Sequence, residues 1–280
     1  MKTLLSIGHG YSAQGLARIL LPLGWRIIGT TRNADKAAKM RADGVEAVIW
    51  PAEDISPALE QASHLLTSVA PDAGGDPVLA ALGPQILASD LEWVGYLSTT
   101  GVYGDHKGGW VDEETPLSPS TQRGQHRVLA EDQWQALGLP LHIFRLAGIY
   151  GPGRGPFAKV LEGKARRILK PDQVFSRIHV DDIAQVLAAS IAHPDPGRAY
   201  NVCDNDPAPP EDVIAYAAEL LGLPTPPSED WDKAKMTPMA RSFYAESKRV
   251  RNDRIKEKLG VKLIHPDYRS GLRALFDAEF

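Results

Sequence analysis

The chain has 280 residues, of which 43% are hydrophobic and 24% charged, with a formal net charge of −4 at pH 7. This composition is typical of a globular protein that can bury a core, and the charge argues against a nucleic-acid partner bound by bulk electrostatics. The single cysteine, Cys203, excludes an internal disulfide, and the chain shows neither a signal-peptide pattern nor a long apolar run. We therefore expect a cytoplasmic protein with no membrane contact.

Short apolar runs alternate with helical patterns through the first two thirds of the chain. They predict strands at 4–7, 25–30, 46–49, 64–69, 93–97, 141–145 and 199–203. They predict helices at 14–21, 34–42, 76–88, 122–137, 181–192 and 211–221. This alternation is typical of an α/β fold with a parallel, doubly wound sheet of the Rossmann type. Ligands of such a sheet bind at the carboxyl ends of its strands.

A glycine-rich turn follows the first predicted strand and opens the first predicted helix. It reads Gly8-His9-Gly10-Tyr11-Ser12-Ala13. In this G-x-G-x-x-A pattern the first glycine allows a tight turn, and the second lets backbone N–H groups approach a pyrophosphate. The alanine allows the helix to pack closely on the strand. We therefore expect Gly8, Gly10, Tyr11, Ser12 and Ala13 to bind a dinucleotide.

The end of the second predicted strand bears on which dinucleotide is bound. NAD-binding chains commonly place a carboxylate there for the ribose hydroxyls, whereas this chain has Thr31 and Arg32. A guanidinium pairs with a 2′-phosphate that a carboxylate would repel. We therefore predict NADP rather than NAD, with Thr31 and Arg32 at the phosphate. In the alternative interpretation Arg32 points into solvent.

Further motifs follow in a fixed order: YLSTTGVYG at 96–104, FRLAGIYGPG at 144–153, RIHVDDIA at 177–184 and YNVCD at 200–204. With the glycine turn, they resemble the extended short-chain dehydrogenase/reductase superfamily in its NAD-dependent epimerase/dehydratase branch, over residues 3 to about 222. The resemblance implies a Rossmann domain at 1–150 and 176–204. It also implies a smaller substrate lobe at 151–175 and 205–280, with a cleft between the two.

The resemblance further implies a catalytic Ser/Thr, Tyr and Lys. The Ser/Thr position falls on Thr99, whose hydroxyl would polarise a substrate oxygen. The Y-x-x-x-K pair should lie on the helix at 122–137, but with Glu131 aligned, Arg123 takes the tyrosine position and Arg127 the lysine position. Arginine keeps its proton near neutral pH and cannot replace the tyrosine as acid and base. Arg127 can still hold the nicotinamide ribose, and Ser68 is expected to lie over it.

Three other side chains are candidates for the missing acid and base. Tyr103 and Tyr150 follow predicted strands at the expected cleft, although both have structural interpretations as well. His126 lies on the same helix as Arg123, and histidine side chains commonly act as acid and base. Tyr150 is also a candidate substrate contact.

His179 begins the stretch His179-Val180-Asp181-Asp182 at a predicted helix start. The resemblance places it beside the substrate cleft, and we expect it to contact substrate. The eight histidines show no metal-ligand spacing, so no metal site is predicted. Cys203 is expected to be a small buried residue rather than a nucleophile.

Two functions remain open from the sequence. One is an NADP-dependent enzyme acting on a hydroxyl or carbonyl group of a small molecule, such as a nucleotide-linked sugar. The other is a dinucleotide-binding sensor or scaffold that has lost the catalytic pair. By analogy with such proteins, the helices at 76–88 and 122–137 suggest a homodimer.

Overall fold

The computed structural model describes the backbone of residues 1–280 and the side chains of all of them except Met239. Its centre is a seven-stranded sheet in which every pairing is parallel. The strands are β1 (Thr3–Ile7), β2 (Arg26–Thr31), β3 (Glu46–Ile49), β4 (His64–Thr67), β5 (Trp93–Thr99), β7 (Leu141–Leu146) and β11 (Arg198–Val202). Their order is β11-β7-β5-β4-β1-β2-β3, so the chain reverses direction across the sheet between β1 and β4. A crevice for ligands opens at such a reversal.

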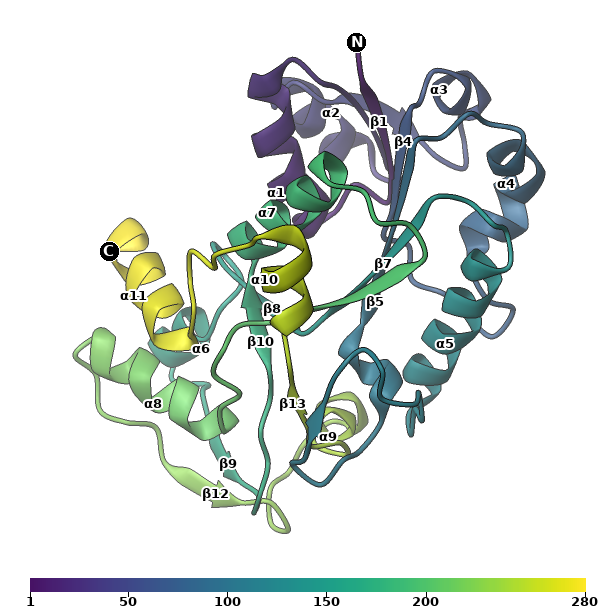
Figure 1. Ribbon diagram of the computed structural model, residues 1–280. Helices are drawn as coiled ribbons and strands as arrows, with labels where there is room; N and C mark the ends of the chain where they lie inside the picture. Colours follow the sequence, from purple (N-terminus) through teal and green to yellow (C-terminus); the bar gives the residue numbers. More distant parts are fainter.

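Helices cover both faces of the sheet (Figure 1). One apolar cluster joins the sheet to α1 (Tyr11–Leu20), α2 (Ala34–Ala42), α7 (Val180–Ala192) and α10 (Asp253–Leu259). A second cluster joins it to α3 (Ser56–Glu60), α4 (Pro77–Leu87) and α5 (Gln122–Gln135). Because both faces are covered, β1, β4 and β7 are buried at every residue rather than at alternate ones.

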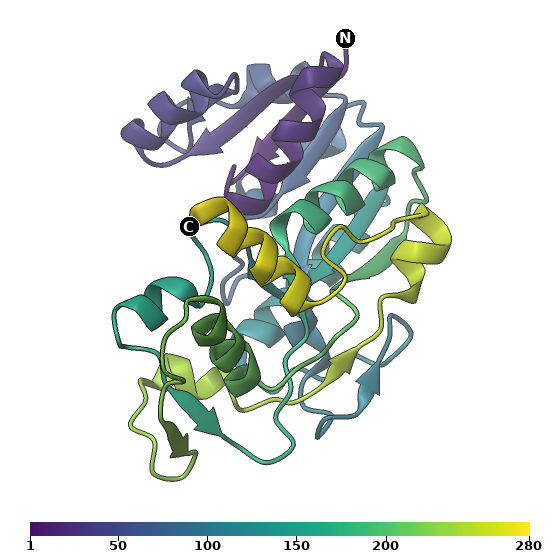
Figure 2. The same ribbon diagram turned by 90° about the vertical axis from the view of Figure 1, so that its left-hand side faces the viewer.

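A smaller lobe lies beyond the carboxyl ends of the strands, below the sheet in Figure 2. Its elements are α6 (Phe157–Leu161), β9 (Arg167–Leu169), α8 (Pro210–Leu220), β12 (Ser228–Asp230), α9 (Pro238–Phe243) and α11 (Tyr268–Glu279). A third apolar cluster, which includes Tyr150, Phe157 and Tyr268, holds α6, α8 and α11 together. Short parallel pairs link lobe and sheet: β8 (Gly148–Tyr150) with β10 (Arg177–His179), and β6 (Trp110–Val111) with β13 (Arg249–Val250).

The predicted fold class is confirmed, and each predicted strand and helix of the sheet domain has a counterpart within a few residues. Residues 205–280, which we expected to lie in the lobe, are divided between the lobe and the sheet domain. Val250, Ile255, Leu259 and Val261 pack in the same apolar cluster as the sheet. The chain therefore leaves the sheet, builds the lobe, returns along β13 and α10, and ends with α11 in the lobe.

Candidate functional site

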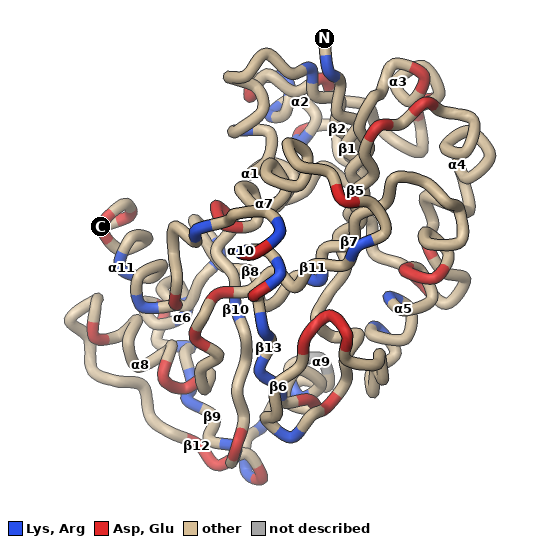
Figure 3. Tube along the Cα trace, in the orientation of Figure 1, with Lys and Arg blue, Asp and Glu red and all other residues tan. Residues whose placement is uncertain are grey.

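A cleft of about 890 Å³ lies between the carboxyl ends of the sheet strands and the lobe. Its walls include the glycine loop, the ends of β4 and β5, the first turns of α5, the strand β8 and the segment around β13. Five cationic side chains and one carboxylate line it: Arg123, Arg127, Arg154, Arg177, Lys248 and Glu246. Figure 3 shows Lys and Arg along α5 and at β13. This excess of positive charge favours an anionic ligand.

The glycine loop is fixed by its two neighbouring strands. Gly8 has a φ of +78°, donates its N–H to Thr30 Oγ1 over 2.8 Å, and accepts a hydrogen bond from the Ser68 hydroxyl. A Cβ on Gly8 would lie 3.1 Å from Ser68 Oγ. Gly10 is the N-cap of α1 and has no side chain to accept from the first turn, which also contains no acidic residue. The N–H groups at this helix start are therefore available to a phosphate.

Thr99 ends β5 and lies in the wall of the cleft. Its Oγ1 accepts a hydrogen bond from the N–H of Gly101 over 3.1 Å, which caps the short helix η2 (Thr100–Tyr103). The hydroxyl group keeps its own proton free to donate. Ser68 lies in the same cleft, at the end of β4.

The two arginines at the Tyr and Lys positions both reach the cleft. Arg127 donates from Nη1 to the Tyr96 hydroxyl over 2.9 Å and to the carbonyl of Leu97 over 2.8 Å. Arg123 instead donates to Ser242 Oγ over 2.9 Å, and its guanidinium lies 4.6 Å from the ring centroid of Phe243. Arg127 is thus fixed at the end of β5, whereas Arg123 contacts α9 of the lobe.

Tyr103 lies outside this cleft and is fully buried. Its hydroxyl donates to Asn201 Oδ1 over 2.7 Å and accepts from Arg145 over 3.0 Å. Burial raises the pKa of Tyr103 to about 12. Arg145 is in turn paired with the buried Glu131 over 2.8 Å. We therefore do not retain Tyr103 as a catalytic candidate, because its hydroxyl is occupied within the core.

Tyr150 lines the cleft, but its hydroxyl points toward the lobe and lies 3.4 Å from the carbonyl of Asp267. Burial and nearby carboxylates, Asp204 first among them, raise the pKa of Tyr150 far above its usual range. His179 is buried behind Tyr150, with ring centroids 5.2 Å apart, and is not part of the cleft wall. His126 is not part of it either, so neither histidine is placed to contact substrate there.

Thr31 and Arg32 also lie outside the cleft wall: Thr31 is the last residue of β2, and Arg32 follows it. Thr31 is buried and accepts a hydrogen bond from the N–H of Asn33 over 3.2 Å, while Arg32 is exposed. Ala13 is buried under the loop. Cys203 is buried and donates to the carbonyl of Val250, as expected of a small core residue.

One pair of ionisable residues in the cleft was missed by the sequence analysis. Lys248 Nζ lies 2.6 Å from Glu246 Oε2, and each side chain is about 10% exposed. Glu246 also accepts from Ser120 Oγ over 2.6 Å, next to the start of α5. The pair comes from the lobe, far along the chain from α5, and no local pattern marks it.

Among the described helices, none combines the length and apolarity that a membrane crossing requires.

Comparison with known proteins places these features in context. A family model described as "NAD dependent epimerase/dehydratase family" matches residues 7–203. Protein YeeZ of Escherichia coli (strain K12) is 29% identical over 290 residues, covering 95% of this chain and 97% of that protein. A functionally unknown conserved protein from Silicibacter pomeroyi DSS superposes with a TM-score of 0.95 at 66% identity, covering 100% of both chains. The NAD complex of UDP-glucuronic acid 4-epimerase from Bacillus cereus has a TM-score of 0.78 at 17% identity, covering 98% and 97%.

Proposed function

Because the chain belongs to the NAD-dependent epimerase/dehydratase family, we propose that it binds a nicotinamide dinucleotide in the cleft and acts on a hydroxyl or carbonyl group. The observation that carries this proposal is the meeting of the glycine loop, Ser68, Thr99 and Arg127 in one cleft. These groups come from the ends of β1, β4 and β5 and from α5, which is where a doubly wound sheet binds such a ligand.

The glycine loop fits a pyrophosphate because its backbone leaves room and its N–H groups are available. Arg127 would hold the nicotinamide ribose as a fixed cation, and Ser68 would lie alongside. When bound, the nicotinamide supplies hydride-transfer chemistry. Thr99 would donate a hydrogen bond to the reacting substrate oxygen.

For proton transfer we propose Lys248, positioned by Glu246. Lys248 lines the same cleft as Thr99, and its ion pair with Glu246 holds the ammonium group in place. Glu246 is itself held by Ser120 beside the start of α5, on the side of the cleft where a catalytic tyrosine would stand. Lysine can gain and lose a proton, whereas Arg123 and Arg127 cannot. Lys248 would give a proton to the carbonyl oxygen of a substrate that is reduced in the cleft.

The substrate class we propose is an anionic hydroxyl or carbonyl compound, with a nucleotide-linked sugar as the first candidate. The cationic lining of the cleft supports an anionic ligand. The epimerase that shares this fold carries UDP-glucuronic acid in its name.

A preference for NADP over NAD is a further part of the proposal. Arg32 is exposed beside the end of β2, and β2 ends without a carboxylate. Arg32→Ala is then expected to weaken NADPH binding about 10-fold and leave NADH binding unchanged. Lys39→Ala, which removes an exposed cation from the helix that follows, is the control. Tighter binding of NADH than NADPH, with a ratio unaffected by Arg32→Ala, would contradict the preference.

The second candidate function is dinucleotide binding without turnover. It is favoured by Arg123, which occupies the tyrosine position and is engaged with Ser242 and Phe243 of the lobe. The cytoplasmic location and the homodimer remain predictions from the sequence.

The test is a fluorescence titration with NADH and NADPH, followed by single-turnover oxidation of the bound cofactor across aldehydes, ketones and keto-sugar nucleotides. The proposal expects saturable binding and oxidation with at least one substrate. Lys248→Gln is then expected to slow that oxidation about 100-fold without changing cofactor affinity, because it removes the proton donor. Lys258→Gln, exposed on α10, is the matched control. Binding without oxidation would support the second candidate, and the absence of binding would exclude both.

A further inference from the structure

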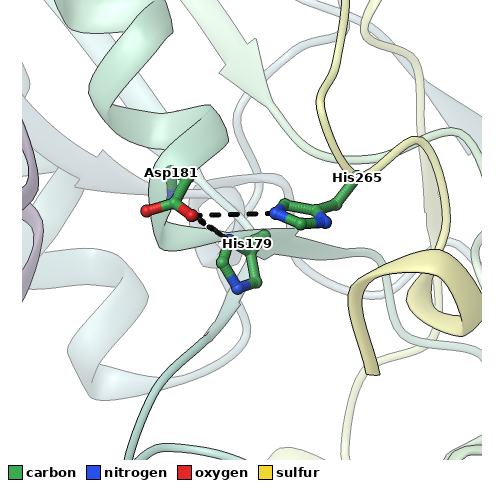
Figure 4. A group of neighbouring side chains, drawn as sticks. All are labelled: His179, Asp181 and His265. Atoms are coloured by element: carbon green, nitrogen blue, oxygen red, sulfur yellow. Dashed lines mark hydrogen bonds and ion pairs between the residues drawn. The ribbon is translucent and has the colours of Figure 1, made fainter. Parts of the chain in front are cut away.

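Three side chains from two distant segments meet outside the cleft wall, and one of them, His179, packs against Tyr150. His179 ends β10, Asp181 lies in the first turn of α7, and His265 precedes α11. Asp181 Oδ2 lies 3.5 Å from His179 Nδ1 and 3.7 Å from His265 Nε2. These three atoms all lie within 4.8 Å of one another. Figure 4 shows the Asp181 carboxylate facing both imidazole rings.

We propose that His179, Asp181 and His265 bind one divalent first-row transition-metal ion, with Zn²⁺ as the best match. Zinc–ligand bonds of about 2.0–2.2 Å in a tetrahedral site separate neighbouring ligand atoms by about 3.3–3.6 Å. The two distances to Asp181 Oδ2, 3.5 and 3.7 Å, are close to this separation. Two imidazole nitrogens and one carboxylate oxygen suit zinc and its neighbours, whereas Mg²⁺ prefers oxygen ligands alone.

The Asp181 side of the cluster is open to solvent. The His179 and His265 side chains are 2% and 10% exposed, while that of Asp181 is 44% exposed. The histidines are thus held by packing, and solvent reaches the ion position beside Asp181. A fourth ligand would be water, as in sites with three protein ligands.

The two histidines are also oriented by contacts outside the cluster. His179 Nδ1 accepts the N–H of Asp181 over 3.2 Å, so its lone pair points at the start of α7, beside the Asp181 carboxylate. Metal binding would replace this long capping bond with a stronger one. The Asp182 carboxylate accepts the N–H groups of Ile264 over 2.7 Å and His265 over 3.0 Å, which fixes the backbone that carries the third ligand. Such support from outside the ligand set is usual at metal sites.

Two positive charges oppose a cation here. Arg18 Nη2 lies 3.6 Å from Asp181 Oδ1, and the start of α7 carries the positive end of the helix dipole. The Arg18 side chain is 61% exposed, so it can move away at little cost. Arg18→Gln is therefore expected to tighten metal binding a few-fold, which a purely structural role for the cluster would not produce.

A bound ion would join β10, α7 and the segment before α11 at the junction of sheet domain and lobe. The His179 ring packs edge-on against Tyr150, which lines the cleft. The ion would therefore stabilise one wall of the cleft from behind without touching a ligand in it. This inference is independent of the proposed function.

The test uses the full-length protein after EDTA treatment, titrated with Co²⁺ by visible absorption and with Zn²⁺ by calorimetry. We expect one equivalent of each to bind, Mg²⁺ to give no heat, and Zn²⁺ to raise the melting temperature. His265→Gln and Asp181→Asn are each expected to weaken binding about 100-fold, since each removes a ligand. His193→Gln, an exposed histidine at the other end of α7, is the matched control.

Circular dichroism and cofactor titration check that the variants fold. Asp181→Asn is the safer variant because its side chain is half exposed. Failure of Zn²⁺ and Co²⁺ to bind below about 1 mM would overturn the proposal. One-to-one binding that persists unchanged in both His265→Gln and Asp181→Asn would overturn it as well, since the ion would then lie elsewhere.

Discussion

The glycine-loop wall of the cleft (residues 8–13 and 68) is built largely from backbone, whereas the arginine wall (Arg123, Arg127, Glu246 and Lys248) is built from charged side chains. In the first, Gly8 is fixed by hydrogen bonds to Thr30 and Ser68. In the second, Arg123 is fixed by Ser242 of the lobe, and Lys248 by the neighbouring Glu246. A backbone site binds any phosphate of the right shape, while side chains decide what is done to the substrate. On the proposed function, cofactor binding would persist although Arg123 takes the position of the tyrosine.

Lowering the pH is expected to have the largest effect, a loss of folding stability that arises at His9 in the glycine-loop wall. Burial, with help from Lys36, lowers the pKa of His9 to about 4. Between pH 6.5 and 4 the unfolded chain therefore binds a proton that the folded chain does not. Stability falls as pH falls through this window, by about 3 kcal/mol from His9, with no further loss from it below pH 4.

Chemical denaturation at pH 7, 5.5 and 4 measures this loss. His9→Gln should show a shallower dependence than the wild type, and His193→Gln the same dependence as the wild type. If stability fell equally with pH in all three proteins, His9 would have an ordinary pKa, and the loop would be more open to water than the structure shows.

Gly8→Ala should weaken dinucleotide binding about 100-fold, because the new Cβ meets Ser68 and Val69 where the φ of +78° already disfavours a side chain. Gly24 is the matched control, since it has the same φ of +78° but nothing within 4 Å of the position that a Cβ would take. Gly24→Ala should cost some stability and leave cofactor affinity unchanged. A fluorescence titration with NADPH compares them, and equal losses in both variants would trace the effect to backbone strain alone.

Arg127→Gln should weaken cofactor binding about 10-fold, because it removes the fixed cation at the end of β5. Arg123→Gln, four residues earlier on α5, should leave the affinity unchanged, because Arg123 contacts the lobe instead. The same titration measures both. An equal fall in both variants would mean that the two arginines hold the cofactor together, and the distinction between Arg127 and Arg123 would be lost.

The sequence predicted the sheet domain well because its signals are local. The apolar runs of the seven strands of the central sheet and the glycine loop lie within short stretches, and β3 and α2 match the predicted bounds. The two-residue and three-residue strands were missed, since β6 pairs with β13 and β8 with β10 from far along the chain.

The site residues also divide into those with a local sequence signal, which were found, and those without one, which were not. Gly8, Gly10, Ser68, Thr99 and Arg127 were placed in the cleft from sequence, and the structure puts them in its wall. Glu246 and Lys248 were not found, because their contact with the cleft depends on how the lobe returns to the sheet.

The histidine cluster was also missed because one of its members, His265, lies far along the chain from the other two. Local spacing around His179 gave no ligand pattern, and the prediction of no metal rested on that spacing. His265 lies close to His179 because the Asp182 carboxylate, at the start of α7, accepts hydrogen bonds from the backbone N–H groups of Ile264 and His265. A His–Asp pair in sequence becomes a cluster of three side chains in space.

The most direct test of the account is a crystal structure of the protein with bound NADP or NAD, in which distances from the nicotinamide ring are measured. We expect the pyrophosphate at the start of α1, the nicotinamide ribose beside Arg127, and the Thr99 hydroxyl and Lys248 ammonium facing the reacting carbon. A pyrophosphate bound away from residues 8–13, or the Tyr150 hydroxyl as the nearest proton donor to that carbon, would contradict it.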